Sequence, residues 1–317
     1  MRDVAHHEMS EKRMAEALDD IRRRAFGRWH SMRYDSFRLD RLREMGDELL
    51  DHAAARAQSA PELDEVSRLA LRTAAECALG VISLGCYPNG DQEIRFPLVG
   101  EELTSEELAF RDVVDEAPTA RTWLDAFAIV LVSGLVWEWQ RVTGLLLRDD
   151  YAPAVRDGVP YSALSSTSTP ADLAAMDALC GYLAESRGHL PRDWPTVPLR
   201  KPGHEERAEA AVRLDSAGGL SPDQRLLRVL LDDDQAAFER ALVTRLVAHR
   251  ESVDADPAPR TLLPLETLAL TALAVQVHGW ELDVRSGYLP LGVVGRPDAL
   301  QRAADSERNE LGLWHAR

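Results

Sequence analysis

The chain has few cysteines for its length. Three occur in 317 residues, Cys77, Cys86 and Cys180, and no two of them form a C-x-x-C pair. Disulfide frameworks and zinc sites use cysteines in sets with characteristic spacings, so we expect neither here. Free thiols persist in a reducing compartment, and we therefore predict a cytoplasmic protein.

Long hydrophobic runs are also missing. The N-terminus carries His6, His7, Glu8 and Glu11 where a secretory signal peptide has its apolar core. The longest apolar run, residues 126–137, is twelve residues long. A helix needs about 17–25 residues to cross a bilayer, so this run predicts a buried helix. We expect no secretion by a signal peptide and no membrane partner.

Common catalytic motifs are absent from the sequence. It contains no G-x-S-x-G, no P-loop and no G-x-G-x-x-G. His204, Glu205 and Glu206 begin a sequence similar to a zinc-binding H-E-x-x-H helix, but the second histidine is missing. Ser221 follows a glycine pair and is typical of a helix N-cap after a turn. We predict no catalytic residue, no cofactor and no metal site.

One acidic run keeps an enzymatic alternative open. Asp232, Asp233 and Asp234 resemble the aspartate-rich motifs with which all-helical enzymes hold magnesium. Such a site needs a second acidic cluster on a facing helix, and Asp149 with Asp150 is the comparable pair. The simpler interpretation is that residues 232–234 cap the helix that follows. A generic helical scaffold is a third hypothesis.

A nucleic-acid surface is considered near the N-terminus. Residues 22–24 are three arginines, and Phe26, Trp29 and Tyr34 follow them, so this segment has the side chains that stack on bases. However, residues 1–60 contain 12 acidic and 12 basic side chains. A solvated helix face is the better interpretation, and we predict no nucleic-acid partner.

Negative charge is concentrated in one part of the chain. The net charge is −16, and residues 61–120 hold 13 acidic and 4 basic side chains. The densest cluster has a single basic neighbour, Arg111, and consists of Glu101, Glu102, Glu106, Glu107, Asp112, Asp115 and Glu116. Such a cluster repels itself unless it is solvated or meets a cation. We predict that these carboxylates bind a basic protein partner, with a solvated acidic loop as the alternative.

Hydrophobic periodicity predicts an all-α, multi-helical fold, and a solenoid-like stack of helix pairs is one arrangement that fits it. Asn89-Gly90 is a strong turn signal, so at most one short β-hairpin is expected, near residues 84–99. The predicted helices begin near Met14 (to Ile21), Leu39, Pro61, Trp123 (to Leu147), Asp172, Ser221, Phe238 and Pro264.

The C-terminal part has the most ordered set of signals. Phe238 leads a helix with an apolar stripe, which passes His249 before a proline-containing loop at 254–259. A leucine-rich helix follows and ends near Gly279, a plausible C-cap. Trp280 to Arg285 then predicts a short strand or extended arm.

This order of parts resembles the immunity protein 49 family, which comprises antidotes of bacterial polymorphic toxin systems. Members carry an aromatic-led helix, a histidine near its end, a leucine-rich helix closed by glycine, and a Ser-Asp-Tyr-Leu-Pro signature. Here Gly287 replaces the aspartate. The matching residues are Phe238, His249, Gly279, Ser286, Tyr288, Leu289 and Pro290. We expect these residues to be structural.

The resemblance implies a protein that binds and neutralises a cognate toxin by stoichiometric occlusion, without catalysis. Because residues 101–116 form an acidic cluster, the toxin is expected to be basic. We divide the chain into an N-terminal helical extension (1–60), an immunity-type helical domain (61–294) and a C-terminal tail (295–317). A sub-boundary is placed in the proline-rich segment 188–203. The oligomeric state is left open.

Overall fold

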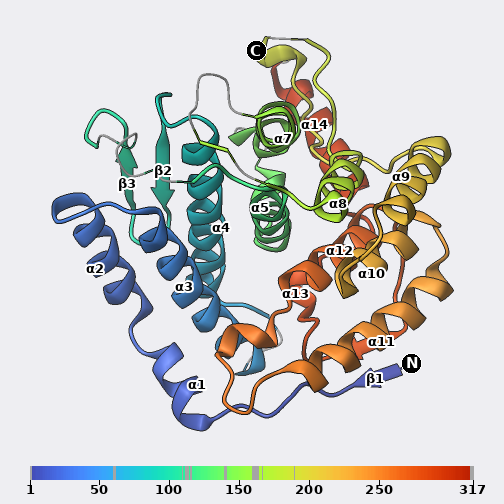
Figure 1. Cartoon of the computed structure of the whole chain (residues 1–317), viewed down its shortest axis with the longest axis horizontal. Coiled ribbons are helices and arrows are strands. Elements are labelled where there is room, and N and C mark those ends of the chain that lie inside the picture. Colours follow the sequence, from blue (N-terminus) through green and yellow to red (C-terminus); the bar gives the residue numbers. More distant parts are fainter. Residues whose placement is uncertain are drawn as a thin grey trace.

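The structure is a computed structural model that describes residues 2–59, 62–108, 110, 114, 116–138, 141–158, 164–165, 167–188 and 190–314. Helices dominate it, as Figure 1 shows. The elements of the first half are β1 (Arg2–Val4), α1 (Glu11–Leu18), α2 (Ile21–Tyr34), α3 (Leu39–Ser59), α4 (Glu65–Cys86), β2 (Glu93–Phe96), β3 (Glu101–Thr104), α5 (Ala120–Val132), η2 (Leu135–Trp137), α6 (Thr143–Leu145), η4 (Leu146–Tyr151) and α7 (Ala152–Asp157). The predicted all-α fold is confirmed.

The second half continues the helical pattern with one further strand. Its elements are α8 (Pro170–Cys180), η5 (Pro191–Asp193), α9 (His204–Ala217), α10 (Pro222–Leu231), α11 (Gln235–Ser252), η6 (Pro259–Leu262), α12 (Leu265–Gln276), β4 (Val284–Ser286), α13 (Leu291–Val294) and α14 (Ala299–Trp314). Contacts join elements far apart in sequence, since α5 packs on α12 and α3 packs on η6. A solenoid has contacts mainly between sequence neighbours, so the helices are not arranged as a solenoid-like stack.

Helices α4, α5 and α12 form the centre of the core. Helix α4 is long and apolar enough to cross a membrane by length and composition, but 83% of its most apolar stretch is buried inside the fold. It packs against α3 on one side and α5 on the other. Its one buried carboxylate, Glu76, accepts hydrogen bonds of 2.6 and 2.8 Å from Arg141. Helix α4 is therefore a core helix whose buried charge is paired.

Helix starts follow their capping signals. The carboxylate of Asp64 accepts the N–H of Ser67 at 2.8 Å and begins α4. The predicted start at Pro61 lies outside the described residues. The predicted cap at Ser221 is confirmed, because its hydroxyl accepts the N–H of Gln224 at 3.1 Å. Each such cap contributes about 1 kcal/mol.

Two predicted helices have different bounds in the structure. The spacing of Met14, Leu18 and Ile21 predicts one helix, but the chain forms α1 and α2 because Asp20 caps a new start at Ile21. The helix predicted to run from Trp123 to Leu147 ends at Val132.

The early end of α5 has a local cause. Gly134 adopts a left-handed conformation with φ 75°, which turns the chain away from the helix axis. The indole N–H of Trp123 then donates to the carbonyl of Leu147 at 2.8 Å. The segment 143–151 therefore folds back along α5 and does not extend it.

The hairpin is present but lies further along the chain than predicted. Helix α4 continues to Cys86, and β2 pairs antiparallel with β3 across a turn at residues 97–100. Asn89-Gly90 forms an earlier turn, between α4 and β2. A second strand pair was not predicted, and it joins β1 in parallel to β4 with Arg2 opposite Val284. Short strands at opposite ends of a chain carry no local signal of their pairing.

Candidate partner-binding surface

The acidic cluster lies on the β2–β3 hairpin and in the chain that follows it. Glu101 and Glu102 belong to β3, Glu106 and Glu107 lie in the turn after it, and Glu116 precedes α5. Asp112 and Asp115 lie outside the described residues. The described carboxylates therefore share one edge of the molecule, beside α2 and α3 (Figure 1).

Two of these carboxylates are held by arginines of the N-terminal helices. Glu107 accepts a bidentate hydrogen bond from Arg33 on α2, and Glu116 accepts a single hydrogen bond from Arg43 on α3. The hydrogen bond from Arg33 lowers the pKa of Glu107 and raises the pKa of Arg33 itself. Both pairs are partly exposed, so each stabilises the fold only weakly.

Three carboxylates keep their charge available. Glu101, Glu102 and Glu106 form no ion pair within 4 Å with any residue that the structure describes, and Glu102 and Glu106 are exposed. Glu102 stands opposite Arg95 in the strand register. The part of the cluster able to attract a basic partner is thus smaller than the sequence suggests.

An aromatic row on α2 lies against this hairpin. The indole N–H of Trp29 donates to the backbone carbonyl of Glu102 at 3.1 Å and anchors α2 to β3. Around Trp29, the rings of Phe26 and Tyr34 lie 5.3 and 6.2 Å from it, centroid to centroid. Phe26 is 46% exposed and Tyr34 62% exposed. Exposed aromatic side chains beside free carboxylates have the composition of a protein-binding surface.

We call the set Phe26, His30, Tyr34, Glu101, Glu102 and Glu106 the acidic–aromatic face. The spacing of these aromatic residues is visible in the sequence, but the sequence predicts only a solvated helix face for residues 21–34. Their position beside the hairpin depends on contacts some 70 residues apart in sequence, such as Trp29 with Glu102, which local patterns do not report.

The signature residues lie together and bind the N-terminal arm, residues 2–10. Tyr288, fully buried, receives the backbone N–H of His7 at 2.9 Å on its hydroxyl oxygen. The hydroxyl of Ser286 donates to the carbonyl of Val4 at 2.7 Å. His249 lies edge-on to Tyr288 with ring centroids 5.1 Å apart. These residues therefore hold the start of the chain against β4 and α11.

His7 is the centre of this contact, and its surroundings favour the neutral ring. The hydroxyl of Thr261 donates to Ala258, so Thr261 accepts Nε2–H of His7 at 3.0 Å. Nδ1 of His7 then accepts the hydroxyl proton of Tyr288 at 2.7 Å. Burial, together with the neighbouring His249 and His6, lowers the pKa of His7. Burial likewise lowers the pKa of His249, which donates to the carbonyl of Thr261.

The remaining signature positions have packing or backbone roles. Phe238 is fully buried and lies under Trp280, with ring centroids 5.6 Å apart. Gly279 has φ 75°, the left-handed conformation with which a helix commonly ends. Leu289 is buried, and Pro290 precedes α13.

Gly287 makes room for the N-terminal arm. A Cβ atom at this position would collide with the imidazole of His6. The glycine in this chain therefore accompanies the close approach of His6 to the signature segment.

The three consecutive aspartates have separate partners. Asp234 caps α11 by accepting the N–H of Ala237 at 3.0 Å, which confirms the predicted capping role. Asp232 pairs with Arg228 at 2.6 Å on the surface. Their carboxylates do not converge, and the part of the chain that the structure describes contains no group of three or more acidic, His or Cys side chains arranged to hold a metal.

Asp233 is the member whose role was not predicted. Its φ is 59°, unusual for a non-glycine residue, and its carboxylate accepts hydrogen bonds from Lys201, Arg207 and His278 at 2.8, 3.0 and 2.6 Å. Burial raises its pKa, but the hydrogen bonds from Lys201 and His278 outweigh burial and hold the pKa below its usual range.

The network continues from Asp233 into the core. Burial lowers the pKa of His278, so the neutral ring donates Nδ1–H to Asp233 and accepts the hydroxyl proton of Tyr182 at 2.9 Å. Tyr182 is fully buried, and burial raises its pKa. Tyr182, His278 and Asp233 line none of five cavities compared among the described residues. This row of polar groups joins α8, α9, α10 and α12 and has the character of a structural network.

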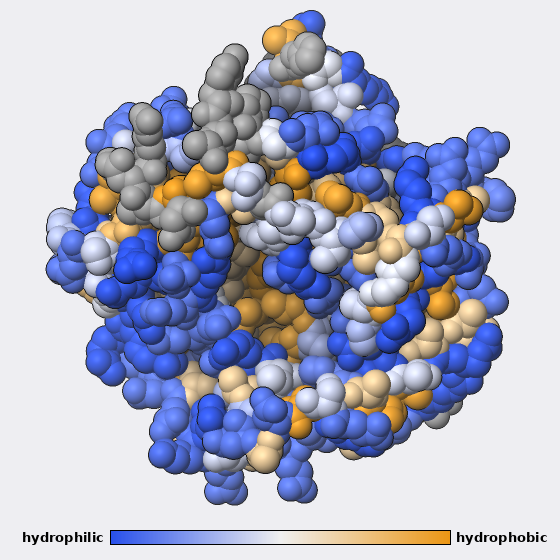
Figure 2. Space-filling view, viewed as in Figure 1, coloured by the Kyte–Doolittle hydropathy of each residue, from blue (hydrophilic) through white to orange (hydrophobic). Residues whose placement is uncertain are grey.

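A cleft of about 540 Å³ opens between α3, α4, α5 and the start of α12, and Figure 2 shows its apolar floor in the middle of that face. Ala74, Cys77 and Ile129 line the floor, where burial raises the pKa of the Cys77 thiol. On its rim Arg260 pairs with Asp47 at 3.2 Å. The cleft thus has an apolar floor and a rim on which charged side chains pair with each other.

Comparison with protein families identifies a match over most of the chain. Residues 57–293 match the family model described as immunity protein 49. No curated protein and no solved structure matches the chain. The match covers well over half of the sequence and contains all of the signature residues, from Phe238 to Pro290. The chain therefore belongs to the immunity protein 49 family.

Proposed function

We propose that this protein is the antidote of a bacterial polymorphic toxin system, which binds a cognate toxin and neutralises it by stoichiometric occlusion, without catalysis. The observation that carries the proposal is membership of the immunity protein 49 family over residues 57–293. The protein acts in the cytoplasm in this proposal, in keeping with its three free cysteines.

The acidic–aromatic face is the proposed toxin-binding surface. Phe26 and Tyr34 offer exposed rings of the kind that anchor protein interfaces. Glu101, Glu102 and Glu106 lie on the neighbouring hairpin and form no ion pair within 4 Å among the described residues. A basic surface on the toxin fits both features, because opposite charge steers association and the rings supply contact area. Covering such a surface would deny the toxin its substrate.

Helix α2 lies before residue 57, where the family match begins. An antidote must discriminate its own toxin from others, and discrimination requires surface that differs among relatives. A binding face built partly outside the matched region supplies such surface. The matched region, in this view, provides the scaffold and α2 provides part of the specificity.

The proposal is tested by co-expression. The product of the neighbouring gene is produced alone and together with this protein, and the tagged protein is captured from the lysate. We expect the neighbour to be toxic alone, harmless in the pair, and recovered in an equimolar complex. A neighbour that is toxic in both cultures and absent from the capture would refute the pairing. The double variant Phe26→Ala/Tyr34→Ala then tests the face, and Val212→Ala, at an exposed apolar residue on α9, is its matched control.

A further inference from the structure

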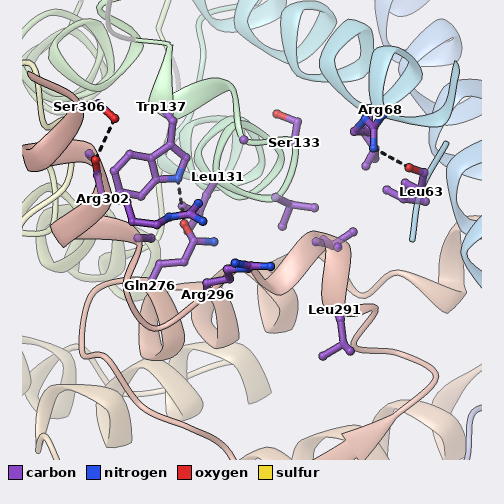
Figure 3. Close-up of a pocket in the computed structure, with 18 of the residues that line it drawn as sticks. Leu63, Arg68, Leu131, Ser133, Trp137, Gln276, Leu291, Arg296, Arg302 and Ser306 are labelled. Atoms are coloured by element: carbon purple, nitrogen blue, oxygen red, sulfur yellow. Dashed lines mark hydrogen bonds between the residues drawn. The ribbon is translucent and has the colours of Figure 1, made fainter. Parts of the chain in front are cut away.

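A groove with basic walls lies on the molecule away from the acidic–aromatic face. Its volume is about 1050 Å³, and it runs between the end of α5, the start of α4, and the segment from α13 into α14. Figure 3 shows Arg68 at one end of the groove, Arg296 over the middle and Arg302 at the other end. The net charge of the protein is −16, but the three arginines make this groove locally positive.

These arginines are poorly neutralised by the residues that the structure describes. Arg68 donates to the backbone carbonyl of Leu63 at 2.8 Å and has no acidic partner among the described residues. Arg296 likewise has no ion pair within that part of the chain. Arg302 lies 3.8 Å from Asp298, a long contact between exposed side chains. The lining also includes Asp305, which accepts hydrogen bonds from Gln301. Positive charge therefore predominates in the groove.

The floor of the groove is apolar and fixed in place. The indole N–H of Trp137 donates to the side chain of Gln276 at 2.9 Å, and Gln276 donates to the carbonyl of Val294 at 2.8 Å. Gln276 is itself buried, and aliphatic side chains of Leu131 and Val293 complete the floor. A surface held by such hydrogen bonds loses little conformational freedom when a ligand binds.

The lip of the groove has an exposed leucine. Leu291 is 78% exposed, the largest exposed fraction of the large apolar side chains that the structure describes. It stands at the start of α13 at the edge of the groove, and its side chain points away from the middle of the groove (Figure 3). Leu291, Arg68, Arg296 and Arg302 are exposed and contribute little to the buried core. An exposed leucine and exposed arginines are both features of a contact with another molecule.

We propose that this groove, which we call the arginine groove, is a docking site for a short acidic segment of the toxin. Carboxylates of the segment pair with Arg68, Arg296 and Arg302, and an aliphatic side chain between them packs on the floor near Trp137. That the partner is the toxin rests on the proposed function. The preference of the groove for an acidic peptide is independent of the proposed function, because it follows from the lining residues alone.

Charge and shape favour a short peptide over a nucleic acid. A polynucleotide extends beyond any groove of this size, and outside the groove it would meet acidic side chains such as Glu62, Asp64 and Glu65. The lining also has a single aromatic ring, the indole of Trp137, whereas single-stranded nucleic acids are bound on several stacking rings. Short carboxylate-bearing segments with leucine or valine match both the charge and the floor.

The position of the groove suits partner specificity. Arg296 and Arg302 follow residue 293, where the family match ends, whereas Arg68 and Trp137 lie within it. The groove is thus completed by a C-terminal segment of this chain, as the acidic–aromatic face is completed by α2. The two surfaces would bind different parts of one partner, the first a basic surface and the second an acidic segment.

The first test uses peptides and the whole protein. A fluorescein-labelled peptide of alternating Asp, Glu and Leu is titrated by anisotropy, with an Asn, Gln and Leu peptide of the same length and an oligonucleotide of equal charge. We expect the acidic peptide to bind about tenfold more tightly than either competitor. Equal binding of the two peptides, or tighter binding of the oligonucleotide, would overturn the proposal.

The second test uses charge reversal. The triple variant Arg68→Glu/Arg296→Glu/Arg302→Glu is expected to bind the acidic peptide about tenfold more weakly, or weaker still. The matched control reverses three exposed arginines elsewhere, Arg22, Arg240 and Arg285, which gives the same change in net charge. Equal losses in the two variants would reduce the effect to net charge and overturn the groove. Circular dichroism verifies that both triple variants are folded. The variant Leu291→Ala leaves all charges in place and is expected to bind the peptide severalfold more weakly.

The third test repeats the reversal in the complex captured with the toxin. If wild-type protein forms that complex and the groove variant binds the toxin with unchanged affinity, the toxin segment does not occupy the groove and the docking proposal fails, while the proposed function stands. If neither wild type nor any variant forms a complex with the toxin, the proposed function fails. The claim that a toxin segment occupies the groove then fails as well. The peptide titrations still decide the chemistry of the groove.

Discussion

The Asp233 network and the acidic–aromatic face both contain charged and aromatic side chains. They differ in whether those side chains find partners within the chain. In the network, Asp233 receives hydrogen bonds from Lys201, Arg207 and His278 of the same chain. On the face, Glu102 and Glu106 are exposed beside the rings of Phe26 and Tyr34.

This difference separates structure from binding. Polar groups whose partners lie within the chain stabilise the fold, and their removal leaves buried donors without acceptors. Polar and aromatic groups without internal partners contribute little to folding and remain available to another molecule. Substitutions in the network should therefore change stability, whereas substitutions on the face should change affinity.

The largest expected effect follows from removing Asp233. Asp233→Ala removes the acceptor of the fully buried His278 ring and the carboxylate partner of Arg207, whose side chain is 10% exposed and keeps only two backbone carbonyls. We expect the free energy of unfolding to fall by about 3 kcal/mol, the cost typical of a broken buried pair. Chemical denaturation measures it.

Asp232→Ala is the matched control, since Asp232 pairs with Arg228 at the surface. It should cost about 0.5 kcal/mol or less. Asp233→Asn, which keeps a side-chain acceptor and tolerates the positive φ, should lie between the two. Equal losses at positions 232 and 233 would contradict the distinction between the network and an ordinary surface pair.

The second prediction concerns the rings of the face. Phe26→Ala and Tyr34→Ala should each weaken toxin binding by about 2 kcal/mol, roughly thirtyfold in Kd, as expected of aromatic anchors. Their free energies of unfolding should change by only about 0.5 kcal/mol, because both rings are substantially exposed. Calorimetric titration with the toxin and denaturation of the free protein give the two numbers. A loss of stability without a loss of affinity would place these rings in the fold.

A smaller effect is expected from the carboxylates. The triple variant Glu101→Gln/Glu102→Gln/Glu106→Gln should slow association with the toxin about fivefold at low ionic strength and flatten its salt dependence. Stopped-flow measurements at several salt concentrations resolve this. Glu205, Glu209 and Glu251, exposed on other helices, provide a control triple with the same charge change. Equal slowing in both would assign the effect to overall charge.

The smallest predicted effect is a pH dependence from the N-terminal arm. The pKa values of His7 and His249 are lowered in the folded protein, so below about pH 6.5 the unfolded chain binds more protons than the folded one. This contribution to stability is present above pH 6.5 and is lost as the pH falls through the folded-state values.

The measurement compares wild type with His7→Gln/His249→Gln. The double variant removes both titrations, so its stability should decline less between pH 7.5 and 5.5 than that of wild type. Taking the difference between the two proteins cancels the carboxylates common to both. An identical decline would mean that these histidines do not titrate differently in the two states.

Local signals account for most of the helical architecture. Ser221 and Asp234 cap helices as their chemistry predicts, and Gly279 takes the left-handed conformation near the end of α12. The predicted hairpin was misplaced because Asn89-Gly90 is a strong turn signal that here ends a helix. The predicted helix after Trp123 was too long because hydrophobic periodicity continues past Gly134, where the backbone turns.

The candidate surfaces depend on contacts that no local pattern contains. His7 meets Tyr288 across 281 positions of sequence, and Trp29 meets Glu102 across 73. The sequence identified the carboxylates by their density, but not that Arg33 neutralises Glu107. The arginine groove has no sequence signal, because Arg68 and Arg302 come from opposite ends of the chain.

The central claim is that this protein neutralises a toxin by binding it and not by a reaction, and a titration tests that claim most directly. A fixed amount of purified toxin is mixed with increasing amounts of this protein, and the remaining toxin activity is measured. The account predicts a linear loss that ends at one equivalent and does not progress with time. Complete inactivation by a small fraction of an equivalent, increasing with incubation, would show turnover and contradict it.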